Sequence, residues 1–325
     1  MGDIRERNDG QPVQGIGGAP AGGSTIQNVF IQHTKVGLWL DGPGSGLVVS
    51  GSIVRDTMAD GINLHIGWSN VTIAHNSFRN TGDDAIALWS QNQPDEAVTI
   101  SYNTVQVPVL ANGVAIYGGR DNTVTDNLVA DTIQQGGGLH VGNRFGSVAL
   151  AGTTTLARNE LHRCGCIDMN WNFGIGAIWF YALDGGGTMD GAVEVSDTVL
   201  HNSPQNAVFF VGNSITNVAL KNVTADGVGS FVLQTRGLKG PDYATLGGGA
   251  SFERVVASGV GFYPVYDCAP EPAFIIDDRG GNSGWLTSCT DDSACHGNST
   301  CQGPASAKFC AHCGFPPAGV HSSVA

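Results

Sequence analysis

The chain has 325 residues, of which 48 are glycine, 41% are hydrophobic and 13% are charged. This composition allows a large buried core with frequent backbone turns and argues against long helices. The net charge of −13 argues against nucleic acid or an acidic polymer as a partner, because a polyanion needs a basic surface. No run of about 18 apolar residues is present, so a membrane partner is not expected, and a neutral ligand fits better.

Residues 1–25 form a Gly-rich lead-in that lacks the apolar centre of a signal peptide. We therefore expect that a signal has been removed or that the chain is a fragment. A repeat pattern begins soon afterwards, around Ile26, with no capping segment before it. Because a solenoid end normally carries a cap, upstream coils or a further domain are expected in the full protein.

From residue 37 onwards, one phrase recurs: a small residue, an aliphatic residue, any residue and another aliphatic residue. Successive copies are 24, 24, 28 and 25 residues apart (61 − 37, 85 − 61, 113 − 85 and 138 − 113). The copies are Gly37-Leu38-Trp39-Leu40, Gly61-Ile62-Asn63-Leu64, Ala85-Ile86-Ala87-Leu88, Gly113-Val114-Ala115-Ile116 and Gly138-Leu139-His140-Val141. A second phrase keeps the same phase and ends in an asparagine, at Asn76, Asn103, Asn127 and Asn159.

Two in-phase strands per coil predict an all-β fold, a right-handed parallel β-helix over residues 26–268. Propeller blades would need a period of about 40 residues, so they are rejected. Aliphatic residues of successive coils should stack inside, and exposed residues should form columns on the surface. The asparagines are expected to form an internal hydrogen-bonded ladder at a turn rather than a ligand site.

Two segments break the rhythm of the repeat. The interval from Ala151 to Gly191 is long, and we expect a loop there that overhangs one face with its aromatic residues Trp171, Phe173, Trp179, Phe180 and Tyr181. Residues 269–325 are expected to be a small disulfide-rich tail in a secreted protein, because five of the eight cysteines lie between Cys289 and Cys313. Disulfides are preferred over zinc at Cys310-Ala311-His312-Cys313, and no connectivity is proposed. Cys164 and Cys166 cannot be paired from sequence.

Three acidic residues fall together when the coils are aligned. Asp60 and Asp84 occupy the same position of successive coils (84 − 60 = 24), so their Cα atoms should lie ~5 Å apart, with Asp83 one residue away. Like charges at ~4–5 Å repel by several kcal/mol at an effective dielectric constant of about 20, so a purely structural role is disfavoured. Calcium binding is the alternative, and it is the preferred interpretation for Asp277-Asp278 and Asp291-Asp292. No cofactor is expected to be required, although structural calcium is an open alternative.

Glycoside hydrolysis needs this kind of carboxylate group. One carboxylic acid protonates the leaving oxygen and, in inverting enzymes, a carboxylate activates water on the other side of the sugar. Asp60 and Asp84 are expected to hold the water, while Asp83, made less acidic by its neighbours, donates the proton. Side chains that flank the acids or follow on the next coils are candidates for sugar binding. They are Trp39, His65, Trp68, Trp89, Tyr117, Arg120, Asp121, His140 and Asn143.

Three segments resemble the motifs of glycoside hydrolase family 87, bacterial α-1,3-glucanases and mycodextranases. They are residues 59–65 (ADGINLH), residues 79–89 (RNTGDDAIALW) and residues 115–122 (AIYGGRDN), with a further likeness at residues 32–43. The resemblance covers about residues 15–260. It implies an inverting endo-hydrolase on a right-handed β-helix, with its catalytic aspartates at Asp60, Asp83 and Asp84. The implied substrate is an α-glucan of the mutan or nigeran type, on which we expect the chain to act as a monomer.

Two other functions are compatible with parts of the sequence. A polygalacturonase shares the fold and the Gly-Asp-Asp phrase, but its substrate carboxylates need cationic groups, and neither an Arg-x-Lys nor a Gly-His-Gly tripeptide occurs here. A non-catalytic carbohydrate-binding β-helix would tolerate three clustered acids without requiring them. A Ser-His-Asp site is disfavoured because no Gly-x-Ser-x-Gly elbow is found.

Overall fold

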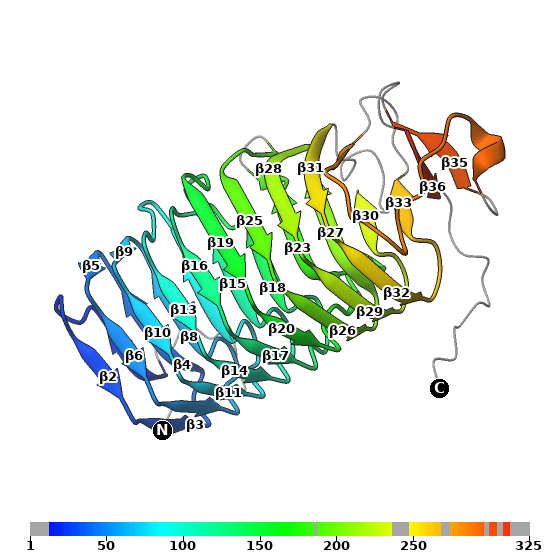
Figure 1. The fold of residues 1–325 in the computed structure, drawn as a ribbon. Helices are drawn as coiled ribbons and strands as arrows, with labels where there is room; N and C mark the ends of the chain where they lie inside the picture. Colours follow the sequence, from blue (N-terminus) through cyan, green and yellow to red (C-terminus); the bar gives the residue numbers. More distant parts are fainter. Residues whose placement is uncertain are drawn as a thin grey trace.

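The structure is a computed structural model that describes residues 13–184, 187–235, 247–267, 274–295, 299–303 and 308–312. In these ranges the chain winds into a right-handed parallel β-helix whose coils contribute strands to three long sheets (Figure 1). The predicted fold class is therefore confirmed. None of the described segments is a helix with the length and hydropathy needed to cross a membrane.

The strands of the three sheets follow one another around each coil. Sheet A contains β1 (Gln14–Gly18), β4 (Val36–Asp41), β8 (Ile62–His65), β12 (Ile86–Trp89), β15 (Val114–Tyr117), β18 (Leu139–Gly142), β23 (Gly176–Ala182), β27 (Asn206–Gly212), β30 (Leu233–Thr235), β33 (Val265–Asp267), β36 (Phe309–His312) and β35 (Ser299–Gln302). Sheet B contains β2 (Thr25–Gln27), β6 (Val48–Ser50), β10 (Thr72–Ala74), β13 (Thr99–Ser101), β16 (Thr123–Thr125), β19 (Thr153–Ala157), β25 (Ala192–Ser196), β28 (Ser214–Lys221), β31 (Gly248–Glu253) and β34 (Ile275–Asp278), with β24 (Thr188–Met189) beside β28. Sheet C contains β3 (Phe30–Gln32), β7 (Ile53–Arg55), β11 (Ser77–Arg79), β14 (Thr104–Gln106), β17 (Leu128–Ala130), β20 (Glu160–His162), β26 (Val199–Ser203), β29 (Thr224–Val228) and β32 (Val256–Val260). Smaller elements are the pairs β5 (Gly44–Ser45) with β9 (Trp68–Ser69) and β21 (Ile167–Asp168) with β22 (Phe173–Gly174), and the 3-10 helix η3 (Asp292–Ala294).

The core is built from the aliphatic positions of the recurring phrase. Leu40 pairs in parallel register with Leu64, which pairs with Leu88 on the next coil. All three side chains are fully buried. Burial of each such side chain contributes roughly 1.5–3 kcal/mol relative to exposure, so stacking the coils stabilises the solenoid along its whole length.

The small residue of the phrase marks a tight passage from sheet C to sheet A. A Cβ atom at Gly37 would lie 2.3 Å from the carbonyl oxygen of Gly61 on the next coil. At Gly61 the same atom would lie 2.5 Å from the carbonyl oxygen of Ala85. The coils therefore approach too closely here for a large side chain, and this passage directly follows the aligned acidic position.

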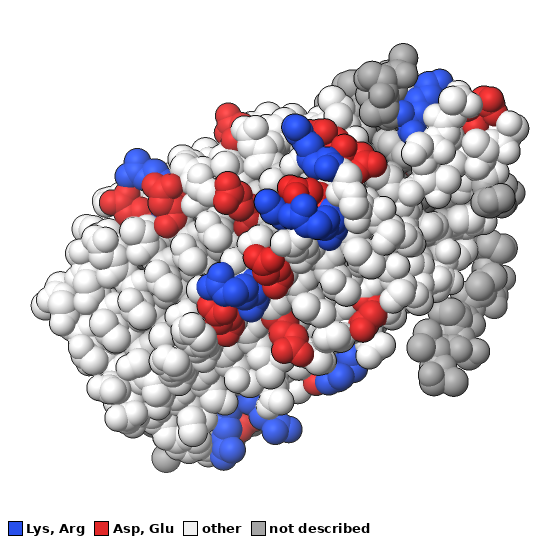
Figure 2. Space-filling model, in the orientation of Figure 1, with Lys and Arg blue, Asp and Glu red and all other residues white. Residues whose placement is uncertain are grey.

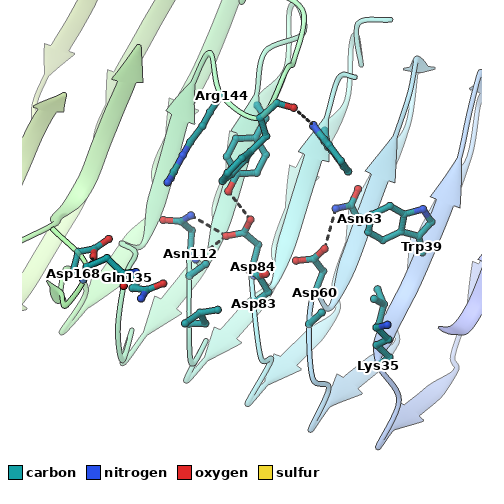
Figure 3. Close-up of a pocket in the computed structure, with 18 of the residues that line it drawn as sticks. Lys35, Trp39, Asp60, Asn63, Asp83, Asp84, Asn112, Gln135, Arg144 and Asp168 are labelled. Atoms are coloured by element: carbon teal, nitrogen blue, oxygen red, sulfur yellow. Dashed lines mark hydrogen bonds between the residues drawn. The ribbon is translucent and has the colours of Figure 1, made fainter. Parts of the chain in front are cut away.

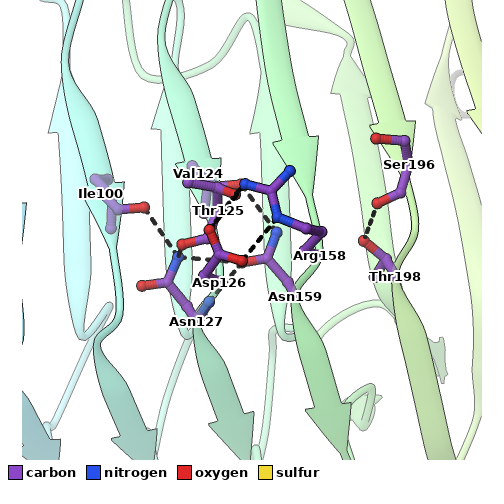
Figure 4. A network of polar contacts seen from close by, with 9 residues as sticks. All are labelled: Ile100, Val124, Thr125, Asp126, Asn127, Arg158, Asn159, Ser196 and Thr198. Atoms are coloured by element: carbon purple, nitrogen blue, oxygen red, sulfur yellow. Dashed lines mark hydrogen bonds and ion pairs between the residues drawn. The ribbon is translucent and has the colours of Figure 1, made fainter.

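The asparagines form the predicted internal ladder. The side-chain amide of Asn103 donates to Oδ1 of Asn127 at 3.0 Å. The side-chain amide of Asn127 donates in turn to Oδ1 of Asn159 at 3.1 Å (Figure 4). Each amide also donates to a backbone carbonyl, such as Asn127 to Ile100 at 2.9 Å. All these asparagines are buried, so the ladder satisfies polar groups that would otherwise be costly inside the protein.

The β-helix is longer than the predicted range of 26–268. It begins at β1, which pairs with β4, and continues through β34, which pairs with β31. Glycine-rich β1 contains Gly15, Gly17 and Gly18, so it lacks the apolar alternation that would reveal a strand. It joins the sheet through its backbone.

The interval from Ala151 to Gly191 is only partly a loop. β19 and β20 continue the coil, and the excursion before β23 spans residues 163–175, which include the β21–β22 pair. Trp179, Phe180 and Tyr181 belong to β23 instead of the overhanging loop. In a strand, successive side chains point to opposite faces, so three aromatic residues in a row can lie on two sides of sheet A. The predicted loop is therefore wrong at these three residues.

The C-terminal tail contains disulfides, as predicted. Cys289 is bonded to Cys301 and Cys295 to Cys310, so Cys310 is not a zinc ligand, while Cys268 and Cys313 lie outside the described residues. β35 and β36 pair antiparallel, and β36 joins β33 of sheet A. The tail thereby extends sheet A.

Cys164 and Cys166 are buried thiols. Burial raises the pKa of both, that of Cys166 to about 11. Both therefore stay protonated at neutral pH and are poor nucleophiles.

Charged residues on the surface occur mostly as local pairs. On the face drawn in Figure 2, basic side chains lie beside acidic ones instead of forming a basic patch. Arg158 contacts Asp126 at 2.8 Å, and Arg163 contacts Asp131 at 2.5 Å. In each pair the two residues belong to neighbouring coils. On this face the basic side chains are therefore neutralised by acidic neighbours.

Candidate active site

Asp60, Asp84 and Asn112 stack on successive coils at the turn between sheets C and A. The amide of Gly61 donates to the carbonyl of Asp84 at 2.9 Å, and the amide of Ala85 donates to the carbonyl of Asn112 at 2.9 Å. One carboxylate oxygen from each of Asp60, Asp83 and Asp84 lies within 4.8 Å of the others (Figure 3). The predicted clustering of the three acids is confirmed.

Asp84 is buried and receives three hydrogen bonds. Its Oδ1 accepts from the backbone amide and the side-chain amide of Asn112, both at 2.8 Å, and its Oδ2 accepts from the Tyr117 hydroxyl at 2.7 Å. Burial raises the pKa of Asp84, and the donors of Asn112 and Tyr117, with the more distant charge of Arg144, oppose that rise. The net effect is that Asp84 holds a proton more readily than an exposed aspartate does.

Asp60 and Asp83 have different surroundings. Oδ2 of Asp60 accepts a hydrogen bond from the side-chain amide of Asn63 at 2.9 Å, inside the protein. Oδ1 of Asp83 accepts from the backbone amide of Asp84 at 3.1 Å, and the Asp83 side chain is more accessible than the other two. The cluster therefore combines two buried carboxyl groups with one that is open to the cleft.

Tyr117 reaches Asp84 because two small residues lie beneath it. Tyr117 packs against Ala87 and Ala115, and Trp89 packs on this group. Ala87 and Ala115 face outward from sheet A in register with Asn63 and His140. Larger side chains at these positions would occupy the space that the phenol ring needs to lie over the sheet. Burial and the nearby Asp84 charge raise the pKa of Tyr117 well above its usual value, so Tyr117 remains a donor.

A hydrogen-bonded chain also fixes the orientation of Asn112. The indole nitrogen of Trp179 donates to Oδ1 of Asn112 at 2.8 Å, and the amide of Gly137 donates to the same oxygen at 2.9 Å. The side-chain NH2 group of Asn112 must then point toward Asp84. Asn112 directly precedes the phrase copy that begins at Gly113, so it holds the position of Asp60 and Asp84 on its own coil, but nothing in the sequence linked Trp179 to it.

A cleft of about 550 Å³ opens above the acids. The predicted site residues Trp39, Asp60, Asp83, Asp84, Trp89 and Tyr117 line it. Trp39 and Trp89 meet edge to face with ring centroids 6.1 Å apart, and the His65 ring lies beside both. Such rings offer apolar surfaces for the C–H faces of sugars.

Sequence reasoning missed the opposite wall of the cleft. Arg144 lies over the rings of Phe145, Trp171 and Tyr181, at 4.4, 5.2 and 4.7 Å from their centroids. Figure 3 shows its side chain directed toward Asn112 and Asp84. Trp171 comes from the predicted overhanging loop, which also contributes Asp168 and Asn170 to the cleft. Arg144 follows β18 in a loop with no repeat pattern, so its sequence position gave no signal.

Two predicted sugar-binding residues are buried, and their assignment is wrong. Trp68 is fully buried, and its indole donates to the carbonyl of Leu40 at 2.9 Å. His140 is 1% exposed and stacks on Trp179 with ring centroids 3.8 Å apart. Burial and the charge of Arg144 lower the pKa of His140, so it supports the site from below as a neutral ring.

Four other predicted residues lie outside the cleft lining. Arg120 pairs with Glu96, and Asp121 accepts from the amide of Thr153 at 2.9 Å. Asn143 donates to the carbonyl of Thr188 at 2.7 Å. His65 contacts Asp41 at 2.8 Å and Gln91 at 3.0 Å, beside the tryptophans. Arg120 and Asp121 follow the sheet A strand, so they turn toward sheet B instead of continuing the predicted column.

The C-terminal acidic pairs, where calcium was preferred, have local partners. Asp277 contacts Arg279 at 2.5 Å, and Asp278 accepts from the amide of Gly280 at 2.9 Å. Asp291 caps η3 by accepting from the amide of Ser293 at 2.9 Å. Within the described residues, the acid cluster with metal-ligand spacing is instead Asp60, Asp83 and Asp84.

Comparisons with known proteins identify relatives of this chain. Residues 1–285 match the family model described as the alpha-1,3-glucanase catalytic domain D2. The catalytic unit of a thermostable GH87 alpha-1,3-glucanase from Streptomyces thermodiastaticus strain HF3-3 is 38% identical over 87% of this chain and 52% of that chain, with a TM-score of 0.79. The Agl-KA catalytic domain is 22% identical over 82% of this chain and 49% of that chain, with a TM-score of 0.71.

A GH87 alpha-1,3-glucanase variant solved with tetrasaccharides is 23% identical over 85% of this chain and 52% of that chain, with a TM-score of 0.70. Among curated proteins, no relative matches the sequence. The chain spans about half the length of the solved structures that it matches. The family match, which covers most of the chain, and the 38% identity establish its relationship. The chain therefore belongs to the alpha-1,3-glucanase family, glycoside hydrolase family 87.

Proposed function

We propose that this protein hydrolyses α-1,3-glucosidic bonds in an α-glucan of the mutan or nigeran type, as a secreted, inverting endo-hydrolase. The observation that carries the proposal is the group of three aspartates from adjacent coils at the bottom of an aromatic cleft. Membership of the family supports the reaction class. Relatives were solved with tetrasaccharides and with nigerose, which supports an α-glucan as substrate.

The spacing of the aspartates adds support. The solved relatives include aspartate-to-alanine variants at two adjacent positions and at a third position upstream. That upstream position precedes the pair by 23 and 24 residues. Asp60 precedes Asp83 and Asp84 by the same intervals (83 − 60 = 23 and 84 − 60 = 24).

We assign Asp83 as the general acid because it is the most accessible of the three and because its carboxyl group lies among two other acids. Asp60 and Asp84 then hold and activate the water. The Asn63 amide on Asp60, and the Asn112 and Tyr117 donors on Asp84, favour carboxylates that can accept a proton. No cofactor is needed for this chemistry, and structural calcium elsewhere is a separate proposal.

The cleft fits a neutral sugar better than pectin. Its two cationic side chains, Lys35 and Arg144, are outnumbered by four carboxyl groups, those of Asp60, Asp83, Asp84 and Asp168. A uronic acid chain would meet net negative charge there. A substrate chain also has room to contact Trp39 at one side and Trp171 at the other, as expected for binding inside a polymer.

The stereochemistry of the first product tests the mechanism. Proton NMR of the anomeric signals during early hydrolysis of an α-1,3-glucan should show the β-anomer before mutarotation. Initial release of the α-anomer would contradict inversion. Release of reducing ends from α-1,3-glucan and not from polygalacturonate would separate the proposed activity from a pectinase, and no release from either would favour a non-catalytic binding protein.

A further inference from the structure

A cluster of two histidines and two carboxylates lies on the outer face of sheet C, away from the acidic cleft. His162 at the end of β20 is in register with His201 of β26, which is in register with Asp226 of β29. Glu160 points outward from the same strand as His162, because Leu161 between them is buried. Three neighbouring coils thus present imidazole and carboxylate groups to one point.

The ligand atoms in this cluster converge. Nε2 of His162 lies 2.5 Å and Nε2 of His201 lies 3.9 Å from Oε1 of Glu160. One atom from each of the three side chains lies within 4.8 Å of the others. The two imidazole rings face each other with centroids 4.7 Å apart. Two ligands of a tetrahedral zinc ion, each about 2.0–2.2 Å from the metal, are separated by roughly 3.4 Å.

Asp226 makes the cluster more than a pair of surface histidines. Its Oδ1 lies 2.8 Å from Nδ1 of His201. A neutral His201 that donates its Nδ1 proton to Asp226 directs the lone pair of Nε2 toward Glu160, so two acceptors face each other. A cation between them removes this conflict. A carboxylate on the other ring nitrogen is also the usual outer partner of a metal-bound histidine.

We propose that Glu160, His162 and His201 bind one Zn²⁺ ion, with Asp226 orienting His201 and water completing the coordination. Two imidazoles and one carboxylate suit zinc and other late divalent ions, whereas calcium prefers a full set of oxygen ligands. Entry of the ion requires the 2.5 Å contact between His162 and Glu160 to open by about 1 Å. Arg163, which follows His162, contacts Asp131 instead, so its charge is paired outside the cluster.

Binding of zinc here would act on stability first. The ion would join β20 to β26, and β20 ends where the excursion that carries Asp168 and Trp171 leaves the coil. A ligand that binds only the folded state raises the melting temperature as its concentration increases. The site is independent of the proposed hydrolase activity, because none of its residues lines the cleft.

The test is zinc titration of the full chain, prepared without a histidine tag and stripped with a chelator. Calorimetry or competition with a chromogenic chelator should give one zinc ion per chain, and the melting temperature should rise by several degrees with zinc but not with calcium. H162Q and H201Q should each weaken zinc binding at least tenfold. D226N should weaken it about 10- to 100-fold, as expected for an outer partner.

Two control variants complete the experiment. H75Q removes an exposed histidine that stacks on Tyr102 at another turn, and D83N changes the acidic cluster in the cleft. Both should keep wild-type zinc affinity. Circular dichroism of each variant reports whether it is folded. Zinc affinity that survives H162Q and H201Q, zinc affinity that is lost in D83N or H75Q, or no zinc binding by the wild type would each overturn the proposal.

Discussion

The asparagine ladder and the acidic cluster use the same stacking of coils with opposite consequences. Along the ladder, Asn103, Asn127 and Asn159 each offer both a donor and an acceptor, so neighbours satisfy one another. In the cleft, Asp60 and Asp84 offer only acceptors when they are ionised, and their donors must come from Asn63, Asn112 and Tyr117. Stacked coils place identical positions side by side, and the side chain decides whether this contact stabilises the fold or prepares a reaction.

Stability and function therefore depend on different columns of side chains in this solenoid. Removal of a ladder residue leaves buried groups of two coils without partners, so it should affect folding. Neutralisation of an acid in the cleft removes like-charge repulsion, so the fold should be preserved. Catalysis should be impaired, because a reacting carboxyl group is lost. Variants of the ladder should therefore change the free energy of unfolding, and variants of the acids should change kcat.

The largest effect is expected for Asp83→Asn. Loss of the general acid should reduce kcat on α-1,3-glucan by at least two to three orders of magnitude. The melting temperature should be unchanged or higher, because the substitution is isosteric and removes one of three clustered charges. Steady-state kinetics and thermal unfolding measure the two quantities, and activity within tenfold of the wild type would remove Asp83 from the mechanism.

An activated substrate separates the three acids by role. A nigero-oligosaccharide with a dinitrophenyl leaving group needs little protonation, so D83N should recover most of its lost rate on it. D60N and D84N should remain slow on the same substrate, because the water is still not activated. Recovery in D84N instead of D83N would exchange the roles of these neighbours.

Asn127→Ala should strongly reduce stability without reducing kcat. Asn127 donates to Asn159 and to the carbonyl of Ile100, and accepts from Asn103. Its loss leaves buried polar groups unsatisfied, so the free energy of unfolding should fall by about 2–4 kcal/mol. Denaturant unfolding measures this change. The kcat of the folded fraction should stay at the wild-type value. A stable but inactive variant would contradict the assignment of the asparagine ladder to stability alone.

The fold was predictable because repetition encodes it many times. Gly61, Ala85 and Gly113 mark the same tight passage on successive coils, and one aligned column brought Asp60 beside Asp84. The ends were less predictable, since β1 and β34 pair through their backbones without a clear repeat phrase.

The site was predictable only where it follows the repeat. Arg144 and Trp171 come from loops, so no periodicity placed them over the acids. Trp68 and His140 were assigned to the substrate because they lie near the motifs in sequence or register, yet both side chains are buried. Register specifies the column of a residue, but the volume of its neighbours decides whether solvent reaches it.

Asp95 is a buried acid outside the cleft, and its ionisation should make the stability of the fold depend on pH. Burial raises its pKa to about 7, although the amide of Trp68 and the hydroxyl of Ser90 donate to it. The folded state therefore binds more protons than the unfolded state between pH 3.8 and about 7. The stabilising contribution is complete below pH 3.8 and is lost as the pH rises through 7.

Asp95→Asn should abolish that loss, because an amide keeps an oxygen for the Trp68 amide and a donor for Ser90. Thermal unfolding should show D95N several degrees more stable than the wild type at pH 8 and close to it at pH 4. D126N, at a half-buried surface acid paired with Arg158, should show no gain at pH 8. Equal stability of D95N and the wild type at pH 8 would show that Asp95 is ionised in the fold at little cost.

The smallest effect is expected for Tyr117→Phe, which removes one donor from Asp84 and leaves the ring over Ala87 and Ala115. We expect kcat to fall about tenfold, or ~1.4 kcal/mol of transition-state stabilisation. The Tyr117 hydrogen bond lowers the pKa of Asp84, so its loss should raise that pKa further. If Asp84 acts as the base, the acidic limb of the kcat/KM profile then moves to higher pH. Y102F, at an exposed tyrosine on another turn, should leave the profile unchanged. A shift of the basic limb alone would identify Asp84 as the acid, and a Y117F profile identical to the wild type would mean that Asn112 suffices to hold Asp84.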